Sequence, residues 1–595
     1  MVSFFVSTHV DAVHDSRVDE AKVRWLRFKA SAVQATVESD FASASFCNYL
    51  PSCPPFYADG CGNWVVCAGT WLHKTEANLI DPAGLLARYL VAGAEVLARE
   101  LEGVFSIIIS DARSQSLKVI TDPMGSLHTY LRQTAQGFWV STSSIAISDN
   151  QKLDPVGLAE YLNTGIIYED RSLWLDVNKL GPATVTVIQG SKLSTSRYWQ
   201  IARALEHRLS LNDASEAMMA NLVATLKQLG NRLSPGVSDL TGGYDSRLLL
   251  CGILESGIDF DYTVAGANDS QDVLTAKAIA RQLGLKLHHI RNVTAFSMAR
   301  FEQAISLSDG EYNAFDYARI LDSQGPLSER FAMSLNGSFG EVARGYWWEL
   351  LWPYMERMQP LDADMLARKR FAAVSYVEVM RVPPFISLTA HISGVIRRTL
   401  EPYKDLPMGS QMDAVYLTMR MQRWQGRIAS NTNQIWPSLS PLGFTNVLSP
   451  ILAAAPSARF RSLMPRHIFS KWNHLLATIP LEHGYPPAEV SLRNFYKFAP
   501  IFGSYFDKVV NKVGPHVKQI HSSPALHVSS VIERYGDLLK GNGIDLLQLP
   551  RLLASGLFDE GRLQGFIHSS PIIDGPALQQ WQRLISLEYT LQKYI

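Results

Sequence analysis

The sequence predicts a mixed α/β fold in which a β-rich N-terminal part precedes a parallel sheet and a largely helical C-terminal part. Three patterns indicate this. The first two hundred residues hold short apolar runs between polar turns, strands alternate with amphipathic helices from Asp213, and the pattern beyond about Arg300 is mainly helical. A chain of 595 residues is too long for one hydrophobic core, so we expect two or three domains.

In the N-terminal part, apolar runs of strand length predict strands, and one amphipathic run predicts a helix. The strands are expected at residues 63–72, 104–110, 116–122 and 137–143, and the helix at 81–93. Strands interleaved with helices in this way are typical of a layered domain that contains both α-helices and β-sheets.

From residue 213 the expected elements alternate between helices and strands. Helices are expected at 214–230, 246–257 and 272–284, and strands at 236–240, 260–266 and 285–290. In the third helix Val273, Ala276, Ala280 and Leu283 share one face, and Gly284 is placed to end it. This alternation predicts a parallel sheet covered by helices.

Composition argues against several classes of partner. The formal net charge is zero and only 18% of residues are charged, so no basic nucleic-acid surface is indicated. The N-terminal residues lack the pattern of a secretory leader, and no apolar run approaches the ~20 residues of a membrane helix, so we expect a cytoplasmic protein without a membrane partner. The cysteines (Cys47, Cys53, Cys61, Cys67 and Cys251) form no metal-binding pattern and are expected to be reduced.

The stretch SDLTGGYDSRLLL (residues 238–250) places a polar loop between a predicted strand and a predicted helix. Gly242 and Gly243 can adopt positive φ and let backbone N–H groups approach a phosphate, while Thr241 and Ser246 add hydroxyls. Asp245 would repel a bare phosphate but suits a loop in which a divalent cation bridges it to one. The loop lacks the spacing and lysine of a Walker motif, and a turn that caps a helix is the alternative.

Several motifs in this order resemble the asparagine synthetase family. LTGGYDS resembles the family's pyrophosphate-binding loop, and YTVAG (262–266), NGSFGEVARGY (336–346), SPLGFTNVLSPILAAAP (440–456), LASGLFDEGRL (553–563) and LISLEYTL (584–591) follow as in the family. The resemblance implies that residues 206–595 form an adenine-nucleotide α-hydrolase-like (PP-loop) synthetase domain. It also implies that ATP is bound by Leu240, Thr241, Gly242, Gly243, Tyr244, Asp245, Ser246, Val264, Gly266, Asn336 and Gly337.

Residues 1–205 resemble the family's glutamine-amidotransferase domain, an Ntn-hydrolase-like αββα sandwich, through residues 101–131 and 138–147. Glutamine hydrolysis in that domain requires a cysteine whose own α-amine acts as the base. The sequence begins Met1-Val2-Ser3, and the nearest thiol is that of Cys47. Ser3 would need unusual processing to replace it, so we expect a scaffold domain and an amine donor other than glutamine.

The resemblance also implies a Mg²⁺ site and a proton-transfer residue. Asp245 is the expected first metal ligand, while the family's second acid falls on Gly340, leaving Glu341 either as the second ligand or as an ion-pair partner of Arg344. The family's proton-transfer residue falls on Gly337 or Ser338. Nearby candidates for that role are Tyr346, for which a buried packing role is the alternative, Glu311 and His483.

The family's late lysine is absent from residues 479–487, where His483 is the expected substitute and Lys471 a second candidate. Arg247 could reach a phosphate and Asp272 could lie near the ribose, with surface or intramolecular pairing as the alternative for both. The aromatic and cationic stretches ARGYWWELLW (343–352) and RMQRWQGR (420–427) could line a substrate cleft or form a helix interface.

Within the family, a sandwich without its cysteine is typical of β-lactam synthetases and lasso-peptide cyclases. The resemblance therefore implies ATP- and Mg²⁺-dependent adenylation of a carboxylate in a peptide or small molecule, followed by capture by an amine of the same substrate, with macrolactam cyclisation preferred. A partner protease or carrier protein of the same pathway is expected. An intermolecular ligase, an ammonia-dependent asparagine synthetase and a non-catalytic nucleotide-binding scaffold are the alternatives.

Overall fold

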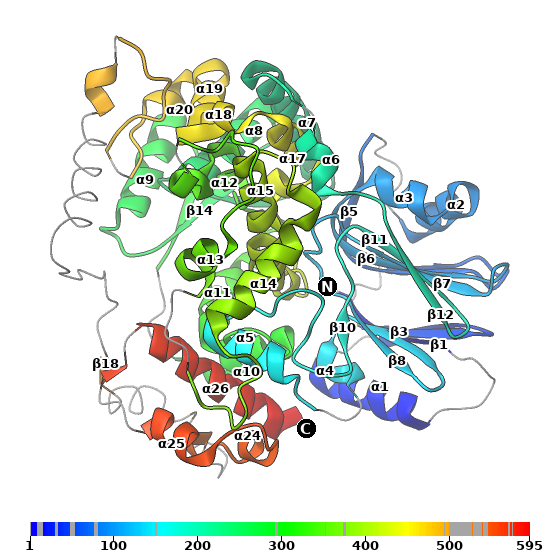
Figure 1. The fold of residues 1–595 in the computed structure, drawn as a ribbon. Coiled ribbons are helices and arrows are strands. Elements are labelled where there is room, and N and C mark those ends of the chain that lie inside the picture. Colours follow the sequence, from blue (N-terminus) through cyan, green and yellow to red (C-terminus); the bar gives the residue numbers. More distant parts are fainter. Residues whose placement is uncertain are drawn as a thin grey trace.

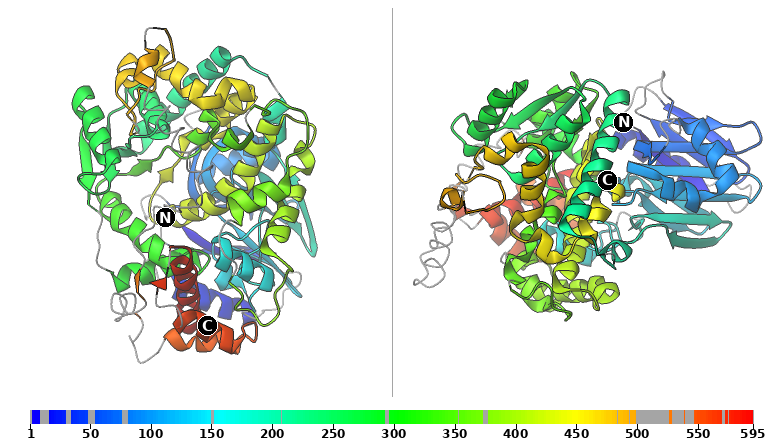
Figure 2. Two further views of the ribbon diagram at one scale, coloured as in Figure 1. Left: turned by 60° about the vertical axis from the view of Figure 1, so that its left-hand side comes forward. Right: turned by 90° about the horizontal axis from the view of Figure 1, so that it is seen from above.

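The computed structural model describes residues 2–8, 16–29, 34–47, 54–75, 81–148, 152–206, 208–291, 296–351, 353–372, 377–482, 484–492, 494–498, 526–527, 538, 546–568, 572–573 and 575–594. Within these residues, the N-terminal part is built on two antiparallel sheets, and a parallel sheet follows (Figure 1). Seen from above in Figure 2, the N-terminal part lies to one side of the remainder.

The two N-terminal sheets each contain six strands. In spatial order, the first contains β10 (Asn178–Lys179), β8 (Tyr130–Thr134), β9 (Gly137–Ser141), β1 (Ser3–Thr8), β3 (Ala42–Cys47) and β2 (Gln34–Ser39). The second contains β12 (Lys192–Arg197), β11 (Thr184–Gln189), β7 (Ser116–Thr121), β6 (Leu101–Asp111), β5 (Trp64–His73) and β4 (Phe56–Ala58). All four strands expected from the sequence are present.

Alternating side chains make these sheets the inner layers of a four-layer sandwich. In β1, Phe4 and Val6 pack into a core shared with Trp64 and Val66 of the second sheet, whereas Phe5 points to the opposite face. That outer face is covered by α1 (Ser16–Lys29), α4 (Ser144–Ile147) and α5 (Pro155–Thr164). The outer face of the second sheet is covered by α2 (Pro82–Ala92) and α3 (Ala94–Glu100), so the αββα arrangement expected from the sequence is confirmed.

The third sheet is parallel, with the strand order β15 (Leu287–Ile290), β14 (Phe260–Ala265), β13 (Gly236–Asp239), β16 (Met333–Leu335) and β17 (Ser438–Leu439). The helices α7 (Leu211–Arg232), α8 (Tyr244–Ser256) and α9 (Gln271–Leu283) alternate with its first three strands, as predicted. The expected face of α9 is buried at Val273, Ala276 and Ala280, and Gly284 ends the helix with φ 67°. The sequence did not predict β16 and β17, which extend the sheet on the other side of β13.

The remaining described residues are mainly helical, as expected. They form α6 (Ile201–Glu206), α10 (Met298–Ser308), α11 (Ala314–Ser328), α12 (Gly340–Arg344), η1 (Tyr346–Leu351), α13 (Ala363–Leu366), η2 (Ala367–Phe371), α14 (Leu388–Leu400), η3 (Glu401–Tyr403), α15 (Met408–Val415), η4 (Tyr416–Gln425), α16 (Gly426–Thr432), η5 (Pro441–Gly443), α17 (Thr445–Ala453), α18 (Pro456–Arg459), η6 (Phe460–Ser462), α19 (Leu463–Trp472), α20 (His474–Thr478), η7 (Phe495–Phe498), η9 (Leu546–Gln548), α24 (Pro550–Ala554), α25 (Glu560–His568) and α26 (Gly575–Tyr594). A short pair, β18 (Leu526–His527) and β19 (Ile572–Ile573), is antiparallel. The final helix α26 packs against α5 and α11, which ties this end of the chain to both halves of the molecule (Figure 1).

None of the described helices is long and apolar enough to cross a membrane. Of the cysteines, Cys61, Cys67 and Cys251 are free thiols, Cys47 is buried, and Cys53 lies outside the described residues.

Candidate functional site

The loop at residues 240–243 leaves the carboxyl end of β13, at the centre of the parallel sheet. The chain builds β14 and β15 on one side of β13 and later adds β16 and β17 on the other, so the strand order reverses at the β13–β16 pair. Ligands of open parallel sheets bind beyond the carboxyl ends of the strands at such a reversal.

The predicted nucleotide-binding residues meet at this edge of the sheet. The N–H of Leu240 donates to the carbonyl of Thr263 (2.9 Å), Val264 and Gly266 lie at the end of β14, and Asn336 and Gly337 follow β16. The side chain of Val264 is buried, whereas Gly266 has φ 146°, a backbone conformation that favours glycine. Stretches about a hundred residues apart in the chain are thus neighbours here.

The loop is braced by its own polar groups. The Oγ atom of Ser246 accepts from the N–H of Thr241 (3.0 Å) and lies 3.0 Å from Thr241 Oγ1, which accepts in turn from the N–H of Gly243 (3.3 Å). The N–H of Gly242 donates to Oδ1 of Asp272 (2.8 Å). The sequence left Asp272 either near a ribose or in a surface or intramolecular pair, and in the structure its carboxylate holds the loop.

The sequence suggested that Gly242 and Gly243 are present for a positive φ. Neither residue has one, so that explanation is wrong. The space around Gly242 is limited instead, since a Cβ there would lie 3.0 Å from Glu482 Cβ and 3.1 Å from Asp272 Oδ1. The helix α8 begins at Tyr244, two residues earlier than expected, and Gly243 at its N-cap offers no capping side chain. The first turn of α8 therefore presents backbone N–H groups and the positive end of the helix dipole.

Asp245 and Glu341 occupy the first turns of two neighbouring helices, α8 and α12. Burial raises the pKa of Asp245 to about 7; the Arg344 guanidinium opposes this shift, and the nearby carboxylate of Glu341 adds to it. Arg344 Nη1 lies 3.5 Å from Oδ2 of Asp245, so Arg344 pairs with Asp245 rather than with Glu341. Glu341 instead faces Tyr416, whose pKa is raised by burial and by that carboxylate.

The carboxylates of Asp245 and Glu341 supply some, but not all, of the ligands that a divalent cation needs. Oδ1 of Asp245 and Oε2 of Glu341 are buried, and neither has a hydrogen-bond partner among the residues that the structure describes. Buried carboxylate oxygens without partners are costly unless a cation compensates them. No group of three or more His, Cys, Asp or Glu side chains that could hold a metal is present in the described part of the chain. A cation held by this pair would take its other ligands from phosphate and water.

Of the proton-transfer candidates that the structure describes, Tyr346 lies beside Arg344 and Glu311 lies away from the loop. Tyr346 was expected to be a buried packing residue if it was not functional, but its side chain is 46% exposed and its ring lies under the Arg344 guanidinium, 4.7 Å away. His483 lies outside the described residues. Glu311 is buried elsewhere, where Oε2 accepts from the Tyr130 hydroxyl (2.7 Å) and Oε1 accepts from the N–H of Leu173 (3.2 Å).

Arg247 and Lys471, the cations proposed from the sequence that the structure describes, are both held by contacts within the protein. Arg247 is fully buried and donates to the carbonyls of Ile479 (2.6 Å), Pro480 (2.6 Å) and Gly242 (3.3 Å), so it fastens the loop to residues 479–480. Its guanidinium is therefore unavailable to a phosphate in this arrangement. Lys471 Nζ lies 2.6 Å from Glu216 Oε1, at the surface between α19 and α7.

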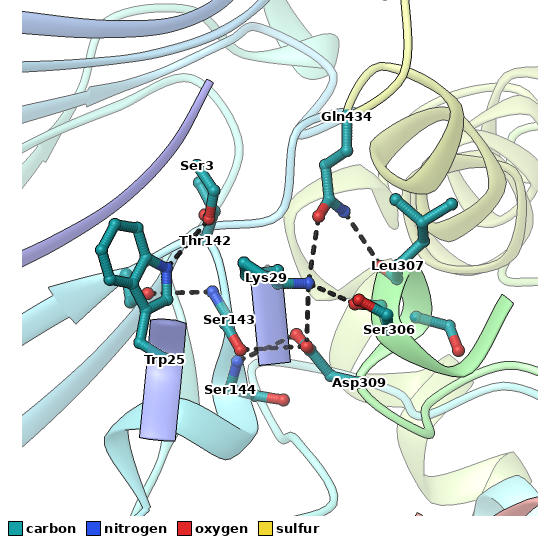
Figure 3. Close-up of polar contacts among 12 residues, drawn as sticks. Ser3, Trp25, Lys29, Thr142, Ser143, Ser144, Ser306, Leu307, Asp309 and Gln434 are labelled. Atoms are coloured by element: carbon teal, nitrogen blue, oxygen red, sulfur yellow. Dashed lines mark hydrogen bonds and ion pairs between the residues drawn. The ribbon is translucent and has the colours of Figure 1, made fainter. Parts of the chain in front are cut away.

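Ser3, the remote substitute for a nucleophile, is buried at the start of β1. Its Oγ lies 2.8 Å from Thr142 Oγ1 and accepts from the indole N–H of Trp25 (3.0 Å), as Figure 3 shows. Cys47, directly opposite Ser3 on β3, is also buried. At both positions the side chain belongs to the packed interior of the sandwich.

Next to Ser3, a buried ion pair that the sequence did not predict joins the sandwich to the helical part. Lys29 Nζ lies 3.1 Å from Asp309 Oδ1 and donates to Gln434 Oε1 (3.0 Å). Asp309 also accepts from the Ser143 hydroxyl (2.9 Å) and the N–H of Ser144 (3.1 Å) (Figure 3). Burial lowers the pKa of Lys29, and Asp309 opposes that shift. This region of the sandwich is occupied by structural contacts.

A comparison with known protein families finds a match for part of the N-terminal half. Residues 77–199 match the family described as a glutamine amidotransferase domain, so the N-terminal part contains a domain of that type. No curated protein matches the chain.

Two solved structures show weak similarity. One is titled the allosteric regulatory enzyme of purine biosynthesis (10% identity, TM-score 0.25, covering 49% of this chain and 80% of that chain). The other is glutamine phosphoribosylpyrophosphate amidotransferase from B. subtilis complexed with ADP and GMP (11% identity, TM-score 0.23, covering 44% and 65%). These TM-scores are too low to inform the fold or the function of this chain.

Proposed function

We propose that this chain is an ATP- and Mg²⁺-dependent amide synthetase related to asparagine synthetases, with residues 1–205 as a scaffold and residues 206–595 as the synthetase domain. A carboxylate oxygen of the substrate attacks the α-phosphorus of ATP, and pyrophosphate leaves. An amine then attacks the acyl-adenylate, AMP departs, and an amide forms. The amine loses its proton in this last step.

One observation carries this proposal. The loop at 240–246 and the turn at 336–341 lie together where the strand order reverses. Each contributes a buried carboxylate oxygen, on Asp245 and Glu341, that has no hydrogen-bond partner among the described residues. A bound Mg²⁺ would supply positive charge to the phosphates and stabilise the departing pyrophosphate. Asp245 and Glu341 would hold it, and the first turn of α8 would direct its backbone N–H groups at the phosphates.

We prefer an amine from the same substrate, and therefore a macrolactam cyclisation of the lasso-peptide type. The support is that Ser3, the substitute nucleophile, and Cys47, the nearest thiol, are both buried, and that Ser3 is held by Thr142 and Trp25. A peptide with a free carboxylate and a free amine is the expected substrate, and a partner protease or carrier protein would deliver it. An intermolecular ligase or an ammonia-dependent synthetase would use the same adenylation step.

ATP–pyrophosphate exchange tests the adenylation step. The full-length protein is incubated with ATP, Mg²⁺, labelled pyrophosphate and a panel of carboxylates and short peptides, and the products are weighed for the loss of one water. We expect substrate-dependent exchange that D245N abolishes and D269N preserves, because Asp269 is an exposed carboxylate at the same edge of the sheet. Unchanged exchange in D245N would exclude the metal role of Asp245.

A nucleotide-binding scaffold is the second candidate, favoured by a specific observation. The N–H groups of Thr241, Gly242 and Gly243 are all bonded within the protein, and residues 479–487 contain no lysine. A scaffold of this kind would bind ATP with no exchange for any carboxylate.

A further inference from the structure

A cleft separate from the loop at 240–246 opens between the sandwich and the helical part, with a cavity volume of about 200 Å³. One wall consists of residues near the end of β12 and the segment that leads into α6, and the opposite wall consists of the end of α14, η3 and η4. The volume is below the range of pockets for drug-sized ligands, so the cleft suits a group about the size of one amino acid.

Three arginines from different elements line this cleft. Arg197, at the end of β12, is exposed and forms no ion pair with any residue that the structure describes. Arg398 of α14 places Nε 2.6 Å from Glu169 Oε1, and Arg423 of η4 places Nη2 3.0 Å from Asp170 Oδ1. The two carboxylates hold Arg398 and Arg423 in position, while Arg197 keeps its full charge toward the cleft.

A buried lysine, Lys179, lies near enough to Arg423 and Asp170 for their charges to act on it. The side chain of Lys179 is only 5% exposed, and its ammonium forms no hydrogen bond or ion pair with the described residues. Burial lowers the pKa of Lys179 to about 8; the carboxylates of Glu311 and Asp170 oppose this shift, and Arg423 and Arg427 add to it. Among the residues that line the cleft, three arginines accompany one carboxylate, that of Asp170, which favours a negatively charged ligand.

Flat apolar side chains lie beside the arginines. Trp199 and Tyr403 line the cleft, together with Pro182 and Pro402. An arginine next to an aromatic ring can bind an oxyanion through the N–H donors at the edge of its planar guanidinium, while the ring packs on an apolar group. The stretch RMQRWQGR, in which the sequence indicated either a substrate cleft or a helix interface, contributes Gln422 and Arg423 to this wall.

We propose that this cleft is a binding site for an oxyanion, either a carboxylate or a phosphate, attached to an aromatic or apolar group, with Arg197, Arg398 and Arg423 as its anion-binding residues. The site is distinct from the loop at 240–246. The proposal does not depend on the synthetase reaction.

Titration calorimetry of the full-length protein tests the site with N-acetyl-L-phenylalanine and with phenyl phosphate. The neutral N-acetyl-L-phenylalanine amide is the ligand control. We expect saturable binding of at least one anion and none of the amide, and an at least tenfold weaker affinity in the double variant R197A/R398A. Both arginines are exposed, so the variant is expected to fold, and circular dichroism checks this.

The matched control variant is R397A, because Arg397 is the neighbouring exposed arginine of α14 but pairs with Asp364 away from the cleft. R397A should bind like the unaltered protein. Preference for N-acetyl-L-phenylalanine would identify a carboxylate ligand, and preference for phenyl phosphate would identify a phosphate ligand. Absence of saturable binding, or equal affinities in R197A/R398A and R397A, would overturn the proposal.

Discussion

The backbone of Gly340 lies against the side chain of Asp245, so that a Cβ added to Gly340 would come within 2.7 Å of Asp245 Cβ and 2.8 Å of its Oδ1. Gly337 is equally close to the same helix start, because a Cβ there would lie 2.7 Å from the Asp245 carbonyl carbon. The position at which the resemblance expected a second acid therefore has no room for a side chain. Glu341, one residue later, is the carboxylate that the packing allows.

The first prediction concerns this contact. We expect G340A to lower the free energy of unfolding by about 1–3 kcal/mol, because the added methyl group must displace Asp245 or separate α12 from α8. Pyrophosphate exchange should fall with it. Urea unfolding and the exchange assay measure the two effects. The control is G561A, since a Cβ at Gly561 in α25 would make only an ordinary contact with the described residues, 3.6 Å from Asp559 Oδ1. Wild-type stability and exchange in G340A would show that the contact is not restrictive.

Local sequence patterns predicted much of the fold, since the expected strands and helices of the sandwich and of the first half of the parallel sheet are present. They did not predict β16 and β17, which are only three and two residues long. Such short strands have no periodicity of their own, and their pairing is with strands distant in the sequence.

In the candidate site, the sequence predicted which residues meet at the sheet edge but not what their side chains do. For Arg247 and Asp272 the sequence left a ligand contact and an intramolecular pairing open, and in the structure both form hydrogen bonds to the loop itself. The sequence also gave no signal for the Lys29–Asp309 pair, which joins residues 280 positions apart. Contacts of this kind depend on tertiary packing, which periodicity and motif spacing do not contain.

The second prediction concerns the buried pair Lys29–Asp309. Removal of one partner leaves the other charge buried, so we expect K29M and D309N each to lower the free energy of unfolding by about 3–5 kcal/mol. The double variant K29M/D309N should lose less than the sum of the two, because neither charge then remains. Urea unfolding of the four proteins completes the cycle. Additive losses would show that the two charges do not stabilise each other.

The third prediction concerns Asp111, which accepts from the Tyr89 hydroxyl (2.7 Å) and lies 3.0 Å from Lys118 Nζ. Burial opposes ionisation of Asp111, but the hydrogen bonds from Tyr89, Ser114 and Lys118 outweigh it and hold its pKa well below the ordinary value. Because the folded pKa is the lower one, the carboxylate stabilises the fold above about pH 4, and this stability is lost as the pH falls further.

D111N should therefore be less stable than the unaltered protein at pH 7, by roughly 1–3 kcal/mol, and the difference should shrink as the pH falls below about 4. Urea unfolding at a series of pH values measures it, with D259N, at an exposed position, as the control. A difference that stays constant between pH 7 and pH 3 would contradict the assignment of these hydrogen bonds to the ionised form.

The last prediction concerns Arg247, whose guanidinium donates to three carbonyls and joins the loop at 240–243 to residues 479–480. Burial lowers the pKa of Arg247 to about 10. A lysine keeps the charge but lacks the planar fork that reaches several acceptors at once, so we expect R247K to lower the free energy of unfolding by about 1–3 kcal/mol. ATP should bind about tenfold more weakly, since a looser loop is less often in the binding conformation.

Thermal unfolding and ATP titration separate the two effects of R247K. The control is R281K, because Arg281 is exposed on α9 and lies outside the loop. A loss of stability with unchanged ATP affinity would mean that Arg247 only packs residues 479–480 against α8. A loss of both stability and ATP affinity in R247K, with no loss of either in R281K, would show that the buried guanidinium positions the loop for the nucleotide.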